Sequence, residues 1–444
     1  MPALTALDRM TRLMTGCLCL LLAAALTADT SEEAAKAYGN LFSSHAIEWA
    51  SIDDLDPLFD AIKDRRFVLL GESSHGTREF YVWRDQISRR LIEQKGFDFV
   101  AVEGDWQIIE RLNGYVKHRV DHDDGVTGLM LEFKRWPQWL WANREFAEFC
   151  EWLRQHNAGL ELDRRVGLFG LDLQDPEASA DAVLEWFHQH NDEHHEKVRK
   201  AYDAFRNLPD SFPGYARHLA DGGQRLDSEA GLAVELLGRS AEPEDKHDWS
   251  ARQNAIAIRR FEKHVHDAVR RGQAEGWNRR AEHFHQTLLR VVEHHGEQAH
   301  GVVWAHNTHV GDASATAMRA QGQVNIGQLL RQSEGPEAVF IVGLTTHGGE
   351  VIAGQRQGAG RQVQEMGTPL SGSAEAMLHE HAPKKAMILF GDETRERQYL
   401  APLPHRAIGI VHNPAREAHV PTLLPWRYDA LIFIDQTSAL TPLH

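Results

Sequence analysis

The amino-acid sequence predicts an α/β protein with a mostly parallel or mixed central sheet flanked by helices, and with a large helical insertion or cap. Short apolar runs bounded mostly by Gly, Asp or Asn recur along the chain, as in strands that helices cover on both faces. Between the third and fourth runs, apolar residues instead recur at helical spacing beside dense charge. The first pattern predicts the core, and the second predicts the insertion.

The expected strands are short and rich in β-branched and aromatic residues. They cover residues 66–72, 97–105, 166–172, 301–307, 338–344, 385–391, 407–412 and 428–435. No repeat of fixed period and no Pro- or Ser-rich linker divides the sequence. We therefore expect a catalytic core in two parts, residues 40–175 and 299–444, with residues 176–298 forming the helical insertion or cap.

Residues 1–28 have the features of a signal peptide. Arg9 and Arg12 precede an apolar stretch at residues 13–26, and small residues follow before Asp29. The stretch is shorter than the roughly 20 apolar residues that a membrane span needs, so we expect no stable membrane insertion after its removal. Cleavage would place the protein in the periplasm or outside the cell. If the segment is instead an overlong gene start or a buried helix, the protein is cytoplasmic.

The charge of the chain limits its partners. The sequence has 48 Lys and Arg residues against 64 Asp and Glu, which gives a formal net charge of −16. Nucleic-acid binding needs basic patches, so we do not expect a nucleic acid as partner. A neutral or cationic small molecule suits this surface better. The sequence leaves the oligomeric state open.

The segment RFVLLGESSHGT, residues 66–77, resembles the nucleophile elbow of serine hydrolases but departs from it at one position. The elbow reads G-x-S-x-G, and Gly71 and Ser73 fit, whereas His75 occupies the place of the second glycine. A histidine side chain would crowd the sharp turn that the elbow requires. We therefore expect Ser73 and Ser74 to be structural, capping a helix that begins near residues 76 and 77.

Polar side chains at three strand ends point to a reactive site. Glu72 and His75 follow the first expected strand, Glu103 ends the second, which we expect to lie beside the first, and His306 and His309 follow the fourth. Ligands of open α/β sheets bind beyond the carboxyl ends of the strands, so these side chains are expected to converge. A histidine held by a carboxylate can take a proton from water and later return it. We expect His75 to be that base, oriented by Glu72 or Glu103.

The histidine pair permits two interpretations. Two histidines with carboxylates from other strand ends could hold zinc or iron. Alternatively, one histidine is a second acid/base or oxyanion donor and the other positions it. Because residues 304–312 contain neither H-E-x-x-H nor paired cysteines, the interpretation without metal or other cofactor is favoured.

Several segments resemble the erythromycin esterase family. They include residues 69–106, 170–173, 302–312 and 428–440, and they contain G-E-x-x-H-G, V-E-x-D-W and W-A-H-N-x-H in order. The resemblance extends over nearly the whole chain after about residue 40. It implies hydrolysis of the ester of a macrolide lactone without a metal, and with it a part in macrolide resistance.

The resemblance also implies roles for single residues. His75 matches the family's general base, with Glu72 and Glu103 arranging it or the water, and Arg84 matches an arginine that supports the site. His306 and His309 match a second histidine pair that stabilises the transition state or the leaving group. The expected partner is thus a small-molecule ester or lactone.

Two alternatives stay open at the level of sequence. One is a metal-dependent hydrolase on a related scaffold, whose candidate ligands are Glu72, His75, Glu103, His306 and His309. The other is an exported small-molecule-binding protein that retains the fold without turnover.

Overall fold

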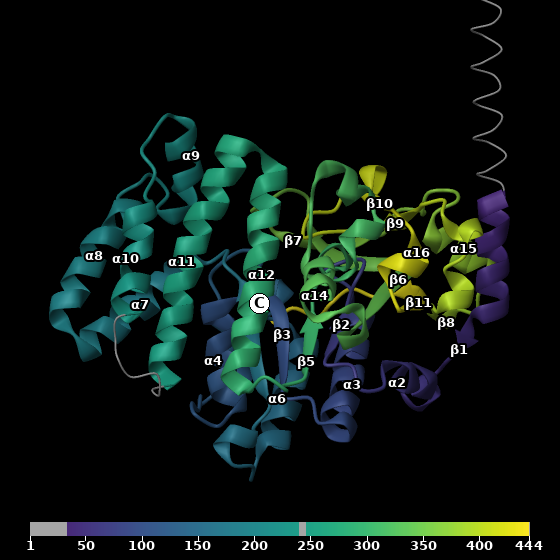
Figure 1. Cartoon of the computed structure of the whole chain (residues 1–444), viewed down its shortest axis with the longest axis horizontal. Coiled ribbons are helices and arrows are strands. Elements are labelled where there is room, and N and C mark those ends of the chain that lie inside the picture. The colour runs from purple at the N-terminus through teal and green to yellow at the C-terminus, as the bar shows by residue number, and fades with distance from the viewer. Residues whose placement is uncertain (1–32, 239–245, 444) are drawn as a thin grey trace, which may run out of the picture.

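The structure, a computed structural model, describes residues 33–238 and 246–443 (Figure 1). The predicted signal peptide, residues 1–28, lies outside the described residues. In the described part of the chain, no helix is long and apolar enough to cross a membrane.

The strands are short, apart from β6. They are β1 (Ile47–Glu48), β2 (Phe67–Leu70), β3 (Phe99–Asp105), β4 (Gly167–Asp172), β5 (Gly301–Trp304), β6 (Val339–Gly354), β7 (Arg361–Glu365), β8 (Lys385–Leu389), β9 (Leu403–Arg406), β10 (His419–Thr422) and β11 (Ala430–Thr437).

Helices connect most of these strands. After a helix at residues 33–45, they are α2 (Asp56–Ile62), α3 (Arg78–Lys95), α4 (Trp106–Val116), α5 (Gly125–Leu131), α6 (Arg144–Asn157), α7 (Pro176–His190), α8 (Asp192–Arg206), α9 (Tyr215–Ala220), α10 (Asp227–Gly238), α11 (Lys246–Arg271), α12 (Gln273–His295), α13 (Asn307–Val310), α14 (Ile326–Glu334), α15 (Ala374–His381) and α16 (Leu424–Arg427).

The main sheet has the order β1-β8-β11-β6-β2-β5-β3-β4, and β7 pairs with the far end of β6. The neighbours from β11 to β4 are parallel, whereas β1, β8 and β7 pair antiparallel. This mixed sheet, flanked by helices, confirms the predicted fold class.

Helices cover both faces of the sheet. Val68 and Leu70 of β2 face a core formed with α2 to α6, while Phe67 and Leu69 face a second core formed with helix 33–45, α12, α14 and α15. Successive side chains of a strand point to opposite faces, which is why a four-residue apolar run serves both cores. The continuous apolar character of the runs therefore has a direct physical cause.

The helices between β4 and β5 include a separate hydrophobic core. Residues of α7 to α11 pack around Tyr202, Phe205 and Ile258, and Figure 1 shows these helices grouped at one end of the molecule. Helix α12 differs from them, because Phe284 and Leu288 pack on the sheet side. The domain boundaries assigned from the sequence stay a prediction.

Two expectations about strands are wrong. Residues 407–412 are not a strand; they form only isolated bridges, from Ile408 to Ser74 and from Val411 to Gly354. The apolar run packs there as an irregular segment against the end of β2. In addition, the strands that precede His75 and contain Glu103 are not neighbours, because β5 lies between β2 and β3.

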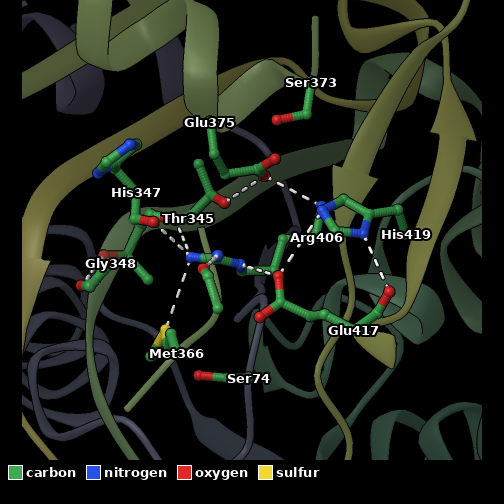
Figure 2. A network of polar contacts seen from close by, with 12 residues as sticks. Ser74, Thr345, His347, Gly348, Met366, Ser373, Glu375, Arg406, Glu417 and His419 are labelled. Atoms are coloured by element: carbon green, nitrogen blue, oxygen red, sulfur yellow. Dashed lines mark hydrogen bonds and ion pairs between the residues drawn. The ribbon is translucent and has the colours of Figure 1, made fainter. Parts of the chain in front are cut away.

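A buried network of charged residues holds Arg406, the residue directly before the irregular segment 407–412 (Figure 2). The guanidinium of Arg406, at the end of β9, donates to Glu417 Oε1 at 2.6 Å. It also donates to the carbonyl oxygens of His347 and Gly367, both at 2.7 Å. Arg406 is fully buried and Glu417 is 5% exposed, so each charge depends on the other for compensation.

The backbone of Arg406 is held by a second carboxylate of the same network. Its N–H donates to Glu375 Oε1 at 3.1 Å, and the Thr345 hydroxyl donates to the same oxygen at 2.8 Å (Figure 2). The network therefore fixes the position at which the segment after Arg406 begins.

We expect Arg406→Gln to lower the free energy of unfolding by about 3–5 kcal/mol, because it leaves Glu417 buried without a counter-charge. The exposed neighbour Arg416 supplies the matched control, and Arg416→Gln should change stability by less than about 0.5 kcal/mol. Urea unfolding followed by tryptophan fluorescence measures both. Equal effects of the two substitutions would contradict the structural role of Arg406.

Candidate active site

The carboxyl ends of β2, β3 and β5 bring the predicted polar side chains together. His75, Glu103, His306 and His309 line one cavity of about 340 Å³, which we call the central cavity. Glu72 lies behind His75 with 2% of its surface exposed, and Arg84 of α3 is fully buried behind Glu72. All six predicted site residues thus belong to one cluster, and their chemical roles stay predictions.

Two glycines allow the turn between β2 and α3 to pass close to its neighbours. A Cβ on Gly71 would lie 2.0 Å from Asn307 Oδ1, and one on Gly76 would lie 1.9 Å from the Ile352 carbonyl oxygen. Neither position has room for a side chain. The turn that presents Glu72 and His75 therefore requires both glycines of the G-E-x-x-H-G motif.

Glu72 joins His75 to Arg84. Its Oε1 lies 2.9 Å from Nδ1 of His75, and its Oε2 lies 2.9 Å from a terminal nitrogen of Arg84. The Arg84 guanidinium is itself held by the aromatic rings of Tyr81 and Trp304, at 4.3 and 5.1 Å from their centroids. This chain fixes the plane of the imidazole ring.

The same contacts decide the charge preference of His75. Burial opposes protonation of the ring, but the hydrogen bond to Glu72 and the charge of Glu103 raise its pKa above the ordinary 6.5. A carboxylate on Nδ1 also favours the tautomer that carries its proton there. The second nitrogen, Nε2, is then an acceptor at the cavity side of the ring.

The two serines do not cap the following helix. Thr77 is the N-cap residue of α3, and the cap has no side-chain hydrogen bond. Ser74 Oγ hydrogen-bonds to the Thr77 hydroxyl, and Ser73 Oγ is buried without a hydrogen-bond partner among the described residues. The capping prediction was wrong, because both hydroxyls point into the packed turn. Neither serine lines the central cavity.

Glu103 binds Arg280, a residue that was not predicted from the sequence. Its Oε1 accepts from Arg280 of α12 at 2.9 Å, and its Oε2 accepts from the backbone N–H of His306 at 2.9 Å. The same guanidinium binds Asp172, at the end of β4, through Oδ1 at 3.0 Å and Oδ2 at 2.5 Å. Glu103 forms no hydrogen bond with His75 in the described structure, so it affects that ring through its charge alone.

The Arg280 guanidinium compensates both carboxylates. Burial would raise the pKa of Glu103, but its neighbours His309 and Arg280 hold that pKa well below its usual range. Burial similarly opposes ionisation of Asp172, and the Arg280 charge lowers its pKa instead. Burial lowers the pKa of His309, which favours its neutral form. Arg280 is therefore the residue that supplies the positive charge beside Glu103 and Asp172 near neutral pH.

His306 has the environment of a neutral hydrogen-bond donor. Its Nδ1 accepts from the backbone N–H of Thr308 at 3.2 Å and lies 2.8 Å from the Thr308 hydroxyl. Burial and the nearby His75 lower its pKa well below 6.5. A neutral ring with Nδ1 as acceptor carries its proton on Nε2, which has no hydrogen-bond partner among the described residues. The His306 and His75 ring centroids are 4.8 Å apart.

His309 is held by contacts with two residues of α12. Its ring stacks on Trp277 of α12, with centroids 4.6 Å apart and planes 9° apart. Its Nε2 lies 3.0 Å from a terminal nitrogen of Arg280. These contacts favour a positioning role for His309 beside Glu103, which lies 3.2 Å from the same nitrogen.

Sequence reasoning missed three residues of this cluster: Asp172, Trp277 and Arg280. Asp172 follows the rule used for the other strand ends, because it closes the third expected strand. Trp277 and Arg280 gave no such signal, since they lie on a charged helix of the predicted insertion. Only the packing of α12 against the sheet brings them to Glu103.

The central cavity lies beside a larger one. The second hollow, which we call the side cavity, has a volume of about 910 Å³ and is lined by α4, residues 132–135 and the start of α7. The two share Ile108, Phe133, Arg135 and Gln174. The segment after Arg406 forms part of the opposite wall, through Ala407, Gly409 and Ile410.

The predicted metal ligands do not gather into a ligand set. In the described part of the chain, the group whose donor atoms lie close enough for a metal is His347, His379 and Asp435, and none of the predicted ligands belongs to it. Asp435 is also paired with Lys384 at 2.9 Å. The carboxylates of Glu72 and Glu103 instead form ion pairs with arginines, Arg84 and Arg280 respectively.

Comparison with known proteins gives a family match. A profile described as Erythromycin esterase matches residues 92–437, a range that contains Glu103, His306 and His309 and begins after His75. An erythromycin esterase type II from Escherichia coli is 31% identical over 121 residues. That alignment covers 27% of this chain and 26% of the relative, so it spans about a quarter of each.

Solved structures share the fold over most of the chain. A Bacillus cereus protein has a TM-score of 0.74 at 19% identity, covering 92% of this chain and 99% of its own. A succinoglycan biosynthesis protein has a TM-score of 0.71 at 20% identity, covering 91% and 98%. An erythromycin esterase mutant, EreC, in its open conformation has a TM-score of 0.60 at 15% identity, covering 90% and 96%.

We expect Arg280→Met to lower the free energy of unfolding by about 3 kcal/mol near neutral pH, because two buried carboxylates lose their counter-charge. Carboxyl groups with lowered pKa values stabilise the fold above their unfolded pKa and lose that contribution as the pH falls through the folded value. The stability difference between wild type and variant should therefore shrink below about pH 4.

Arg199, which binds Glu196 and Asp203 on the surface of α8, is the matched control. Arg199→Met should change stability by less than about 1 kcal/mol. Urea unfolding of both variants at several pH values decides the matter, and a pH-independent loss in Arg280→Met would contradict the charge argument.

Proposed function

Because the chain belongs to the erythromycin esterase family, we propose that it is a carboxylic ester hydrolase acting on a macrolide lactone or a related ester through histidine-activated water. The observation that carries the proposal is the orientation of His75. Its Nδ1 is bound to Glu72 at 2.9 Å, and its ring lines the central cavity. A base needs this arrangement of one fixed nitrogen and one free nitrogen.

The proposed reaction begins with a water molecule beside His75 Nε2. The ring takes one proton from the water as the oxygen attacks the ester carbonyl carbon, and the carbonyl becomes a tetrahedral oxyanion. Collapse of this intermediate breaks the bond to the alcohol oxygen. The protonated His75 then returns the proton to that oxygen, so a lactone opens to a hydroxy acid with the gain of one water.

His306 is placed to stabilise the oxyanion. Its Nε2–H has no partner within the described residues, and its ring lies beside that of His75. A preorganised donor aimed at the developing negative charge contributes more than one that must first reorient. Glu103 and His309 act behind it, because Glu103 holds the His306 backbone N–H and His309 contacts Glu103.

Glu72 and Arg84 complete the base. Glu72 stabilises the imidazolium that forms when His75 takes the proton, and Arg84 holds Glu72 in place through their ion pair. Arg84 is thus a positioning residue rather than a group that touches the substrate. The assignment gives each of the six predicted residues a part in one reaction.

The size of the hollow supports a bulky substrate. The central cavity of about 340 Å³ lies beside the side cavity of about 910 Å³, and four residues line both. Ligand pockets commonly range from about 300 to 1,000 Å³, so the two together exceed what a simple ester requires. A macrocyclic lactone fits this volume better than a short acyl ester.

The charge pairing favours the metal-free route over the metal-dependent alternative. Both carboxylates that a metal would need are bound to arginine guanidinium groups, whose positive charge opposes a nearby cation.

We also propose that the protein is exported, on the pattern of residues 1–28. A part in macrolide resistance is proposed on the family match.

We expect His75→Ala to lower kcat for an accepted lactone by about 10²–10⁴-fold, since it removes the base. Ser73→Ala and Ser74→Ala are the matched controls, because they lie in the same turn and would abolish activity if a serine were the nucleophile. Mass spectrometry of the ring-opened product measures all three. Full activity of His75→Ala would refute the proposal, and inactivity of a serine variant that still folds would reassign the nucleophile.

The pH profile gives a second test. The base must be neutral to accept a proton, and the pKa of His75 is raised above 6.5. We therefore expect kcat/KM to rise with pH and to level off above the raised pKa of His75. Glu72→Gln keeps the shape of the side chain but removes the charge that raises this pKa. The rising limb should therefore move to lower pH as the maximal rate falls. An unchanged limb in Glu72→Gln would show that His75 is not the titrating group.

A further inference from the structure

A cavity of about 610 Å³ lies within the helices between β4 and β5, apart from the central cavity. It is lined by residues at the start of α10, along α11 and along α12. Seven of the lining residues are cationic: Arg225, Arg259, Arg260, Lys263, Arg271, Arg279 and Arg290. Two are carboxylates, Asp227 and Asp267. This excess of positive charge stands in a chain whose formal net charge is −16.

Nearby carboxylates account for part of the cation set. Arg225 binds Glu262 through two hydrogen bonds of 2.9 Å. Arg279 binds Asp267 at 2.7 Å and also Glu282 at 2.9 Å. The charges of Arg225 and Arg279 are therefore already compensated.

Four of the cations have no such compensation. Arg259, Arg260, Lys263 and Arg290 form no ion pair with any carboxylate of the described residues. Arg290 is held instead by neutral groups, donating to Gln253 Oε1 at 2.6 Å and to the Thr287 hydroxyl at 2.8 Å. These bonds fix the direction of the guanidinium and leave its charge unbalanced.

The spacing of the cations on α11 places them on one side of that helix. Lys263 lies four residues after Arg259 and three after Arg260, and Asp267 continues the same row four residues later. Arg290 reaches the cavity from α12, the next helix along the chain. The charges thus converge from two helices.

Bringing these cations together is unfavourable without an anion. Burial lowers the pKa of Arg290 to about 10, and the charges of Arg260 and Arg252 act in the same direction. Burial and the neighbouring Arg259 and Arg279 also lower the pKa of Arg260, against the opposite effect of Glu282. A bound anion would remove this repulsion, since guanidinium groups pair with oxyanions through two parallel hydrogen bonds.

We propose that the cavity between α10, α11 and α12 is a binding site for a small, multiply charged oxyanion, held by Arg259, Arg260, Lys263 and Arg290. Phosphate groups supply the largest charge in a small volume, and polycarboxylates offer the same oxygen geometry with less charge. Inorganic pyrophosphate and citrate are therefore the two probes that separate these sources.

The site is distinct from the central cavity although both use α12. Arg279 lines the cationic cavity, while the next residue, Arg280, binds Glu103 and Asp172. Consecutive residues of a helix point about 100° apart, which allows one helix to serve both. Binding to this site is thus independent of whether the chain hydrolyses an ester.

Isothermal titration of the full chain with inorganic pyrophosphate is expected to show saturable binding to one site, which weakens as salt is raised. The double variant Arg259→Gln/Lys263→Gln should bind at least roughly tenfold more weakly, because two charged contacts are lost. Both side chains are without ion pairs among the described residues, so this variant should fold normally. Binding of citrate as well as pyrophosphate supports the shared oxyanion chemistry, and binding of pyrophosphate alone narrows it to phosphates.

Arg270→Gln is the matched control, because Arg270 lies on the same helix outside the cavity lining. It removes one charge and should leave the affinity within about twofold of wild type. A second variant, Arg260→Gln, should lose pyrophosphate binding while its melting temperature without the anion stays equal or rises. No saturable binding of either probe, or equal loss of affinity in the control and the double variant, would overturn the proposal.

Discussion

Arg280 donates to two buried carboxylates, Glu103 and Asp172, and thereby ties α12 to the carboxyl ends of β3 and β4. Burying a carboxylate is costly unless a counter-charge accompanies it. Here the counter-charge comes from the long helical segment between β4 and β5. The position of that segment over the sheet and the ionisation of the site therefore depend on the same guanidinium.

The consequence reaches His306 through its backbone N–H. Glu103 accepts the backbone N–H of His306, so its fixed position also fixes the start of α13. His306 and His75 then lie 4.8 Å apart between ring centroids, in opposite environments. A carboxylate raises the pKa of one ring, and burial beside that ring lowers the pKa of the other. His75 therefore has the environment of a proton acceptor, and His306 that of a neutral hydrogen-bond donor.

Arginines serve the molecule in three different ways. Arg84 and Arg280 hold the carboxylates of the central cavity, and Arg406 anchors a segment of its wall. In each case the charge is buried and paired. Arg259, Arg260, Lys263 and Arg290 differ because they form no ion pair with the described carboxylates, which is why we propose an external anion for them.

The fold class and most of the site follow from the sequence pattern alone. Short apolar runs predict buried strands, and the carboxyl ends of parallel strands meet at one edge, which groups Glu72, His75, Glu103, His306 and His309. Which of them touch depends on the packing of the whole chain. The insertion of β5 between β2 and β3 directs Glu103 toward His306 and Arg280 instead of His75. Packing also makes residues 407–412 a cavity wall rather than the expected strand. Local pattern encodes which face of an element is buried, whereas strand order and helix docking arise from contacts between segments far apart in the chain.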